Sequence, residues 1–187
     1  LQPDILLTFG GMIVSKKIKK FLRDYSPKEH WHVNELRAFD TYQVLSKHLK
    51  IDSHSFFKHF CELVDYDNKS TYESTWTHYK QRIREKHNHY IKTAPYSDLK
   101  VFEQVLKVIP DFSEVQFSNS AIIRYSQLFE MNSTITVFCN RGTSGIDGST
   151  STALGAAYAT QKPTTLITGD LSFFYDSNAL WNNYIPS

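Results

Sequence analysis

The sequence predicts an α/β protein with parallel, doubly wound sheets and flanking helices, and three observations support this fold class. Short apolar runs typical of buried strands alternate with segments in which apolar residues recur at helical spacing. Glycines or small polar residues follow the strand-like runs, where a helix begins. A central stretch nearly free of glycine and proline lacks this alternation and is helical throughout. We therefore expect two α/β regions joined by helices.

The first α/β region contains one β-α-β unit. Residues 5–9 form an apolar run that ends at a pair of glycines, which predicts a buried strand entering a tight turn. From Val14 the apolar residues keep helical spacing, with lysines between them, until Pro27 stops the pattern. Residues 30–33 predict a second strand. A helix between two strands favours a parallel pair with a right-handed crossover.

The central stretch divides into two helices. Ser53 can cap the first, whose apolar stripe runs to Val64. The second carries an aromatic and apolar stripe from Tyr72 to Tyr90. Pro95 ends the stretch, because the residue before a proline avoids the helical conformation.

The second α/β region is a regular alternation of strands and helices. It opens with a helix that begins near Ser97, and each later apolar run is followed by a helical segment. This alternation predicts a doubly wound sheet, with ligand-binding loops at the carboxyl ends of its strands. The expected elements are strands at 114–117, 134–138 and 164–168, and helices at 121–129, 149–160 and from Ser172.

Composition excludes several classes of partner. The net charge is +2, from 21 basic and 19 acidic residues in 187, so no strong field favours nucleic acid or an anionic membrane. No apolar run approaches the roughly 20 residues of a membrane span. Cys61 and Cys139 lie in apolar periodic segments, which predicts reduced, buried thiols rather than a disulfide. We therefore expect a cytoplasmic protein with small-molecule partners, no nucleic acid and no membrane span.

A glycine-rich loop at residues 140–148 and the pair Gly169-Asp170 follow two of the predicted strands. Ligands of open parallel sheets bind beyond the carboxyl ends of the strands. A carboxylate at that edge suits Mg²⁺ shared with a phosphate, so we expect Asp170 to bind the metal. Two simpler interpretations remain: Asp170 caps a helix, and the small residues of the helix at 149–160 serve only tight packing.

Groups that suit carboxylates lie at the same predicted edge. Arg124 and Arg141 each lie beyond a strand, and guanidinium groups bind carboxylates through paired hydrogen bonds. Ser120 lies in a strand-to-helix turn that can hold phosphate or carboxylate oxygens. Lys16 and Lys17 follow the glycine turn of the first region and could attract an anionic substrate. The alternatives are surface arginines, a helix cap at Ser120 and a solvated lysine face.

Two closely spaced histidine pairs raise the question of a metal site. His30 and His32 could chelate a metal from a strand, whereas His87 and His89 point to nearly opposite sides of a helix. Neither pair has a cysteine or carboxylate at ligand spacing, so the sequence disfavours a structural metal site.

Taken together, these motifs resemble the thiamine diphosphate enzymes, whose diphosphate motif opens with Gly-Asp. The resemblance narrows to the MenD family, the 2-succinyl-5-enolpyruvyl-6-hydroxy-3-cyclohexene-1-carboxylate synthases of menaquinone biosynthesis. It rests on three blocks in the same order, residues 118–124, 140–148 and 169–180. The first region resembles the family's central domain more loosely. The motif reads Gly-Asp-Leu where most thiamine diphosphate enzymes have Gly-Asp-Gly, and this family commonly shows leucine.

The resemblance implies a transferase that forms a carbon–carbon bond. It would decarboxylate 2-oxoglutarate on thiamine diphosphate, with Mg²⁺ or Mn²⁺, and add the resulting carbanion to isochorismate. Asp170 would be the metal ligand, and Ile146 the apolar wedge that bends the cofactor. Of the other matched residues, Gly169, Leu171 and Ser172 would border the diphosphate, and Ser120, Arg124, Arg141, Lys16 and Lys17 would face substrate carboxylates.

The resemblance also divides the chain. Residues 1–50 would be the C-terminal part of the central domain, residues 51–94 the connecting helices, and residues 95–187 the N-terminal part of a truncated thiamine diphosphate-binding domain. The family's activating glutamate and closing asparagines would lie outside this chain, since Asn182-Asn183 comes too soon after the Gly-Asp pair. We therefore expect a fragment that has no catalytic residue of its own and is inactive alone. The full-length protein would be a homo-oligomer with active sites at the subunit interface.

Two alternatives to this interpretation remain. The first is another thiamine diphosphate-dependent decarboxylase or carboligase with different substrates. The second is a non-catalytic α/β module that binds a phosphate ligand or a protein partner.

Overall fold

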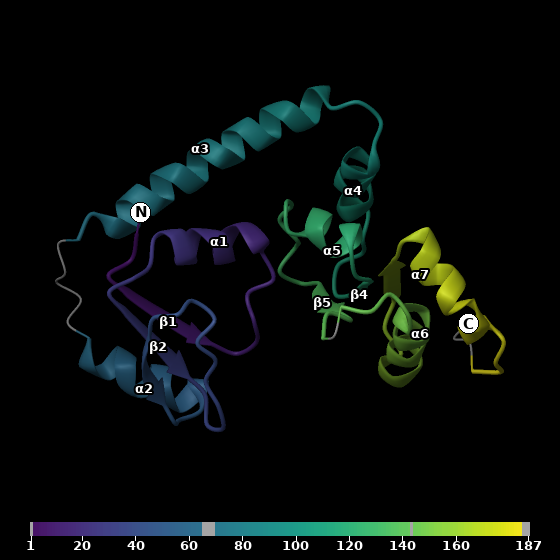
Figure 1. The fold of residues 1–187 in the computed structure, drawn as a ribbon. Helices are drawn as coiled ribbons and strands as arrows, with labels where there is room; N and C mark the ends of the chain where they lie inside the picture. The colour runs from purple at the N-terminus through teal and green to yellow at the C-terminus, as the bar shows by residue number, and fades with distance from the viewer. Residues whose placement is uncertain (1, 65–69, 143, 185–187) are drawn as a thin grey trace. The chain divides into compact units, whose positions relative to one another are not determined.

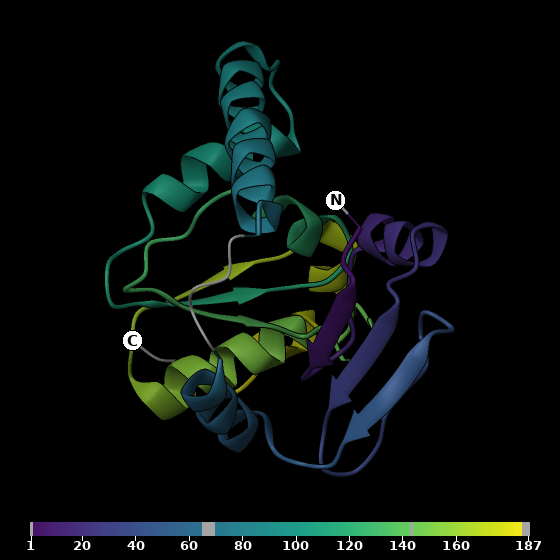
Figure 2. The ribbon, with the colours of Figure 1, turned by 90° about the vertical axis from the view of Figure 1, so that its left-hand side faces the viewer.

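The computed structural model describes residues 2–64, 70–142 and 144–184. The chain forms two compact units, Leu1–Arg84 and Glu85–Ser187. Each unit is built around a three-stranded, fully parallel sheet with helices beside it (Figures 1 and 2). The predicted α/β class with parallel sheets is therefore confirmed. No described helix has both the length and the apolar character that crossing a membrane requires.

The sheet of the first unit places β2 (Glu29–Val33) between β1 (Ile5–Phe9) and β3 (Leu45–Leu49). Both strand pairs are parallel, and β1 pairs with β2 without a shift in register. The strands β1 and β2 agree with the prediction, whereas β3 was not expected. Three polar residues separate the two leucines of β3, so this strand lacks the apolar run that marks a buried one.

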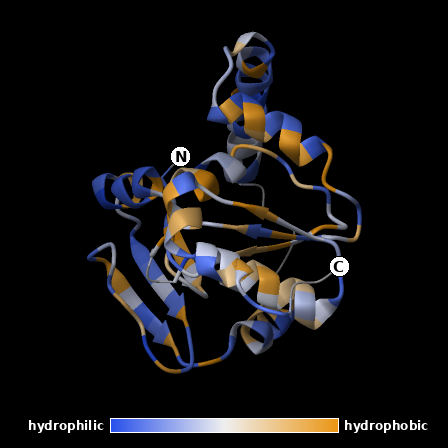
Figure 3. Cartoon of the chain, turned by 90° about the vertical axis from the view of Figure 1, so that its right-hand side faces the viewer, coloured by the Kyte–Doolittle hydropathy of each residue, from blue (hydrophilic) through white to orange (hydrophobic). Residues whose placement is uncertain are grey.

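Helix α1 (Lys16–Asp24) connects β1 to β2. The side chain of Ser15 caps it by accepting a hydrogen bond from the N–H of Ile18 at 3.3 Å. Leu22 is the buried residue of the helix, and its lysines form the hydrophilic face seen in Figure 3.

Helix α2 (Ser53–Leu63) begins one residue after its cap. The carboxylate of Asp52 accepts a hydrogen bond from the N–H of Ser55 at 2.9 Å, so the predicted Ser53 cap is wrong. An aspartate at this position also suits the positive end of the helix dipole. Helix α2 has no fully buried residue, and Cys61 is exposed and not buried as predicted. Neither Cys61 nor Cys139 forms a disulfide.

The sheet of the second unit has the order β5-β4-β6, with all strands parallel and β4 in the centre. All residues of β4 are buried, as expected for a central strand covered on both faces. The elements of this part of the chain are α3 (Tyr72–Thr93, which contains the point where the units divide), α4 (Asp98–Lys107), β4 (Glu114–Phe117), α5 (Ala121–Ser126), β5 (Thr136–Cys139), α6 (Ser149–Thr160), β6 (Thr164–Ile167), α7 (Asp170–Tyr175) and the 3₁₀ helix η1 (Ser177–Leu180).

Successive connections of this sheet run in opposite directions. The chain passes from β4 to β5 on one side and then returns across β4 to β6 on the other. Right-handed crossovers of opposite direction place α5 and α6 on opposite faces, which is the doubly wound arrangement. The core lies on the α4 and α5 side, where Phe102 packs with Val115, Phe117 and Ile135. On the other side α6 buries Ala153.

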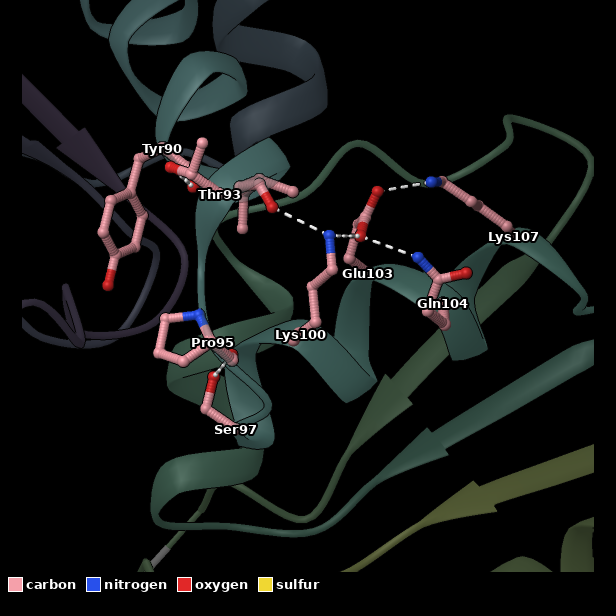
Figure 4. Close-up of polar contacts among 9 residues, drawn as sticks. Tyr90, Thr93, Pro95, Ser97, Lys100, Glu103, Gln104 and Lys107 are labelled. Carbon is pink, nitrogen blue, oxygen red and sulfur yellow. Dashed lines mark hydrogen bonds and ion pairs between the residues drawn. The ribbon is translucent and has the colours of Figure 1, made fainter.

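The side chain of Lys100, on α4, forms a hydrogen bond with the C-terminal end of α3. Its ammonium group donates a hydrogen bond to the carbonyl oxygen of Ile91 at 2.8 Å and lies 2.9 Å from the carboxylate of Glu103. Gln104 and Lys107 contact the same carboxylate (Figure 4). Cations near a helix C-terminus satisfy free carbonyl groups and favour the helix dipole.

Several element ends differ from the prediction, among them one end each of α5 and β5. Helix α5 ends at Ser126, before residue 129, because the following N–H groups bond carbonyl oxygens three residues back. Strand β5 begins at Thr136, because the N–H of Ile135 closes a turn onto the carbonyl oxygen of Asn132.

Candidate functional site

The carboxyl ends of β4, β5 and β6 lead into segments with many buried polar side chains. Ser118 and Asn119, which follow β4, are 0% and 3% exposed. Side chains of these types usually lie on protein surfaces. The buried polar residues at this edge and at the helices that start there are Ser118, Asn119, Ser149, Thr150, Ser172 and Asp176.

Two hydroxyl groups of this set have no hydrogen-bond partner in the described part of the chain. They are the buried oxygens Oγ of Ser118 and Oγ1 of Thr150. Leaving a buried polar atom unsatisfied costs about 1–3 kcal/mol, so an oxygen-rich ligand in contact with them would be stabilised. Thr150 lies in the first turn of α6, where N–H groups and the helix dipole favour an anion and where the carboxylate of Asp176 already accepts a hydrogen bond from the N–H of Ser151. The edge therefore has the chemistry of an anion site.

Asn119 connects the turn after β4 to the glycine-rich loop after β5. Its side-chain Nδ2 donates to the carbonyl oxygens of Asn140 and Gly145, the first residue and an interior residue of the glycine-rich loop. Its Oδ1 accepts a hydrogen bond from Nη1 of Arg141 at 3.2 Å. Asn119, in the turn after β4, thereby fixes the position of the loop after β5.

The glycine-rich loop, described except for Thr143, is also held at its far end. Nδ2 of Asn140 donates to the carbonyl oxygen of Gly148 at 3.2 Å and to Oγ1 of Thr152 at 2.9 Å. Gly148 has φ +74°, a left-handed conformation that favours glycine. The loop thus enters α6 in one defined conformation.

Ser172, in the first turn of α7, contacts the same loop. Its hydroxyl donates to the carbonyl oxygen of Ile146 and lies 3.3 Å from Oγ of Ser149. Ser172 is 4% exposed, and Ile146 is half-buried. The structure therefore brings together two predicted cofactor-binding residues, Ile146 and Ser172.

The Gly169-Asp170 pair starts α7, two residues before the predicted start. The side chain of Asp170 is exposed, and its Oδ1 accepts a hydrogen bond from the N–H of Leu171 at 2.8 Å. No cluster of three or more metal-ligating side chains exists among the residues whose positions are described. A Mg²⁺ shared with a diphosphate takes only one or two carboxylates from the protein, so an accessible Asp170 beside the anion-favouring edge fits this metal.

The predicted carboxylate-binding residues lie around the same edge. Arg141 is the second residue after β5, and its Nη1 donates a hydrogen bond to Oδ1 of Asn119. Arg124 is exposed in the last turn of α5. Ser120 precedes α5 with φ +69° and makes no side-chain cap hydrogen bond. A non-glycine residue in this conformation carries backbone strain, which clusters at functional sites.

The remaining candidates lie in the first unit. Lys16 and Lys17 are exposed in the first turn of α1. His30 and His32 both lie on β2, and Nε2 of His30 and Nδ1 of His32 are each 2.8 Å from the hydroxyl of Thr8. These histidines line a hollow of about 420 Å³ beyond the carboxyl end of this sheet. Burial lowers the pKa of both side chains, which keeps them neutral near pH 7.

Sequence comparison decides the family. A family model described as the middle domain of thiamine pyrophosphate matches residues 1–115 of the 187. The chain belongs to the thiamine pyrophosphate enzyme family. The match runs from β1 through α4 to the first residues of β4. It covers the whole first unit, while the predicted domain boundaries near residues 50 and 94 stay predictions.

Relatives of this thiamine pyrophosphate family member carry the name 2-succinyl-5-enolpyruvyl-6-hydroxy-3-cyclohexene-1-carboxylate synthase. The protein of Flavobacterium psychrophilum is 56% identical over 99% of this chain and 34% of its own length. That of Flavobacterium johnsoniae is 52% identical over 100% of the chain and 33% of its own length. That of Bacteroides thetaiotaomicron is 41% identical over 97% of the chain. The chain spans about a third of the length of the curated relatives it matches.

Sequence reasoning missed two residues of the site in this thiamine pyrophosphate enzyme. Asn119 and Asp176 are buried and bond to segments more than 20 residues away in the chain. The available signal was position alone, since Asn119 lies inside the Ser118-Asn-Ser120 turn and Asp176 closes the α7 segment. A polar residue directly after a buried strand is a candidate for such a role.

Proposed function

We propose that this chain is part of a 2-succinyl-5-enolpyruvyl-6-hydroxy-3-cyclohexene-1-carboxylate synthase, which decarboxylates 2-oxoglutarate and joins the product to isochorismate in menaquinone biosynthesis. The observation that carries the proposal is the 52–56% identity over nearly the whole chain to proteins of that name. The buried polar edge of the second sheet supports it independently, because its groups suit phosphate and carboxylate oxygens.

The residues of this edge are assigned to the cofactor as follows. Thiamine diphosphate, when bound, supplies an electron sink for the carbanion that remains after loss of CO₂. Asp170 holds the Mg²⁺, or Mn²⁺, that neutralises the diphosphate. Ile146 packs as an apolar wedge against the cofactor, and Ser172 holds the backbone of Ile146 in place. Gly169 and Leu171 border the diphosphate beside Ser172.

The arginines of the edge are assigned to the substrates. Both 2-oxoglutarate and isochorismate carry two carboxylates, and guanidinium groups bind carboxylates in a fixed planar geometry. Arg124 and Arg141 therefore orient the substrates, and Ser120 contributes its hydroxyl. Lys16 and Lys17, in the first unit, add positive charge that attracts anionic substrates.

The rest of the catalytic apparatus comes from outside this chain. The glutamate that activates the cofactor and the asparagines that complete the metal site belong to other parts of the full-length protein. The chain alone is then inactive, and the complete enzyme is a cytoplasmic homo-oligomer whose active sites lie between subunits. A different thiamine diphosphate carboligase would share the cofactor residues but use other acids as substrates.

Calorimetric titration of the full-length protein with thiamine diphosphate and Mg²⁺ tests the cofactor assignment. We expect Asp170→Ala to weaken metal-dependent cofactor binding at least tenfold, because the metal loses its carboxylate ligand. Asp98→Ala is the matched control, since Asp98 is also exposed in the first turn of a helix, α4. Equal binding by the native protein and Asp170→Ala would refute the metal role of Asp170.

A further inference from the structure

We propose that Asn119 is a positioning residue that fixes Arg141 and the glycine-rich loop for binding a substrate carboxylate. The inference rests on the proposed function, because it takes Arg141 as a carboxylate-binding group. It gives a role to Asn119, which lies inside the 118–124 block but had none there, and this role differs from direct contact with substrate.

The hydrogen bonds of Asn119 carry the argument. An asparagine side chain offers two N–H donors and a carbonyl acceptor. Nδ2 of Asn119 donates to the carbonyl oxygens of Asn140 and Gly145, and Oδ1 accepts from Nη1 of Arg141 at 3.2 Å. The side chain is 3% exposed, so its orientation is fixed by protein groups and not by water.

A neutral amide is the group that this position requires. The amide oxygen orients the guanidinium group through one hydrogen bond and leaves its positive charge uncompensated. A carboxylate in the same place would pair with Arg141 and compete with a substrate carboxylate. It would also place negative charge against the carbonyl oxygens of Asn140 and Gly145. Asn119 therefore holds Arg141 while keeping it available.

The side chain of Asn119 also contacts the residue next to Ile146, the proposed apolar wedge. Gly145 directly precedes Ile146, whose own carbonyl oxygen accepts a hydrogen bond from Ser172. Consecutive carbonyl groups of the loop are thus held by buried side chains from two different elements. Loss of Asn119 would release the loop at Gly145 and leave the Ser172 contact as its remaining support at that point.

Steady-state kinetics of the full-length protein with 2-oxoglutarate and isochorismate test the role. We expect Asn119→Asp to raise the KM of one of these acids about tenfold or more, with kcat changed less than threefold, because Arg141 becomes paired. We expect Asn119→Ala to raise the same KM by a smaller factor, because Arg141 keeps its charge but loses its orientation. In an Arg141→Ala background, the effect of Asn119→Ala on KM should shrink to the part that comes from the loop contacts.

Hydrogen exchange provides a second readout that does not depend on activity. We expect Asn119→Ala to increase amide exchange in the glycine-rich loop of the ligand-free protein. The matched control is Asn132→Ala, since Asn132 also donates from its amide, to Asp111, and accepts from a backbone N–H, but lies in the turn before β5. This control should leave the KM values and the loop exchange unchanged.

Failure of the positioning role of Asn119 and failure of the proposed function give different results. An active native protein with unchanged KM values in both Asn119 variants, or equal effects of Asn119→Ala with and without Arg141, would overturn the positioning role. If one variant fails to fold, the other still gives the comparison with the native protein. A native protein that neither binds thiamine diphosphate nor consumes the two acids would instead refute the proposed function.

Discussion

Asp176 holds the first turn of α6 through Ser151. One carboxylate oxygen lies 2.6 Å from the backbone nitrogen of Ser151, and the other lies 2.6 Å from its hydroxyl oxygen. Asp176 is 6% exposed and ends α7, so this contact joins the helix that begins with Asp170 to the helix that follows the glycine-rich loop. A carboxylate at the start of a helix satisfies free N–H groups and suits the helix dipole.

Replacing Asp176 by alanine should therefore destabilise the start of α6. We expect a loss of about 1–3 kcal/mol, because a buried hydrogen-bonded carboxylate is removed and the N–H of Ser151 loses its partner. Hydrogen exchange of the α6 amides in the full-length protein measures this loss locally. Asp98→Ala, at the exposed start of α4, should leave α6 unaffected, and native-like protection in Asp176→Ala would contradict the assignment.

Replacing either of two glycines in this region by alanine should change the free energy of unfolding, but in opposite directions. Gly148 has φ +74°, so Gly148→Ala should destabilise the protein by about 1 kcal/mol. Gly155 lies inside α6, and a Cβ there would meet no atom within 4 Å, so Gly155→Ala should stabilise it by about 0.5–1 kcal/mol. Denaturant unfolding of both variants measures the two changes in the free energy of unfolding. A stabilising Gly148→Ala would show that the loop does not require the left-handed conformation.

Buried His30 and half-buried His32 should make the first unit less stable in mild acid. Burial lowers the pKa of His30 and His32 in the folded state, and a neighbouring histidine lowers each further: His32 acts on His30, and His48 acts on His32. In the unfolded state such side chains titrate near about 6.5, so the unfolded chain binds more protons just below that pH. Stability is complete above about pH 6.5 and falls as the pH drops toward the lower, folded pKa.

Melting curves of the full-length protein between pH 7.5 and 5 test this expectation. In His30→Gln the melting temperature should fall less steeply as the pH is lowered, because one buried group no longer titrates. His54→Gln, exposed on α2, is the control and should keep the native slope. The prediction would be contradicted if the melting temperature of the native protein's lowest-temperature unfolding transition stayed the same between these pH values.

The joint between α3 and α4 should also depend on pH, through Glu103. Its carboxylate is bound by Lys107 and Lys100, which lowers its pKa from 4.5 to about 2. Because the folded pKa lies below the unfolded one, the stabilisation is present above about pH 4.5 and is lost as the pH falls toward 2. Glu103→Gln should therefore lower the melting temperature at pH 7, and the difference should shrink in acid. Glu35→Gln, in the exposed loop after β2, should show no such difference at either pH.

The regular elements were predictable where local sequence carried the signal. Apolar runs followed by glycine or a small polar residue identified β1, β4 and β6, and helical spacing identified α1 and α3. β3 was missed because its leucines are separated by polar residues at the edge of the sheet. The Asp52 cap was missed because Ser53 beside it is an equally good cap residue by type.

The candidate site was predictable in position but not in its contacts. The rule for parallel sheets places Asp170 and Arg141 at one sheet edge from the strand pattern alone. The contacts of Asn119 and Asp176 join residues 21 to 26 positions apart, and they depend on the order β5-β4-β6. Strand order follows from packing of the whole unit, so spacing along the chain does not reveal these contacts.

The proposed activity of the full-length enzyme is the coupling of 2-oxoglutarate to isochorismate on thiamine diphosphate. Its most direct test is product analysis by mass spectrometry with the full-length protein, both acids, thiamine diphosphate and Mg²⁺. The account predicts CO₂ release and a product whose mass is the sum of both acids less CO₂, with formation strongly reduced in Arg141→Ala. Failure to form that adduct, or an adduct that forms equally without thiamine diphosphate, would contradict it.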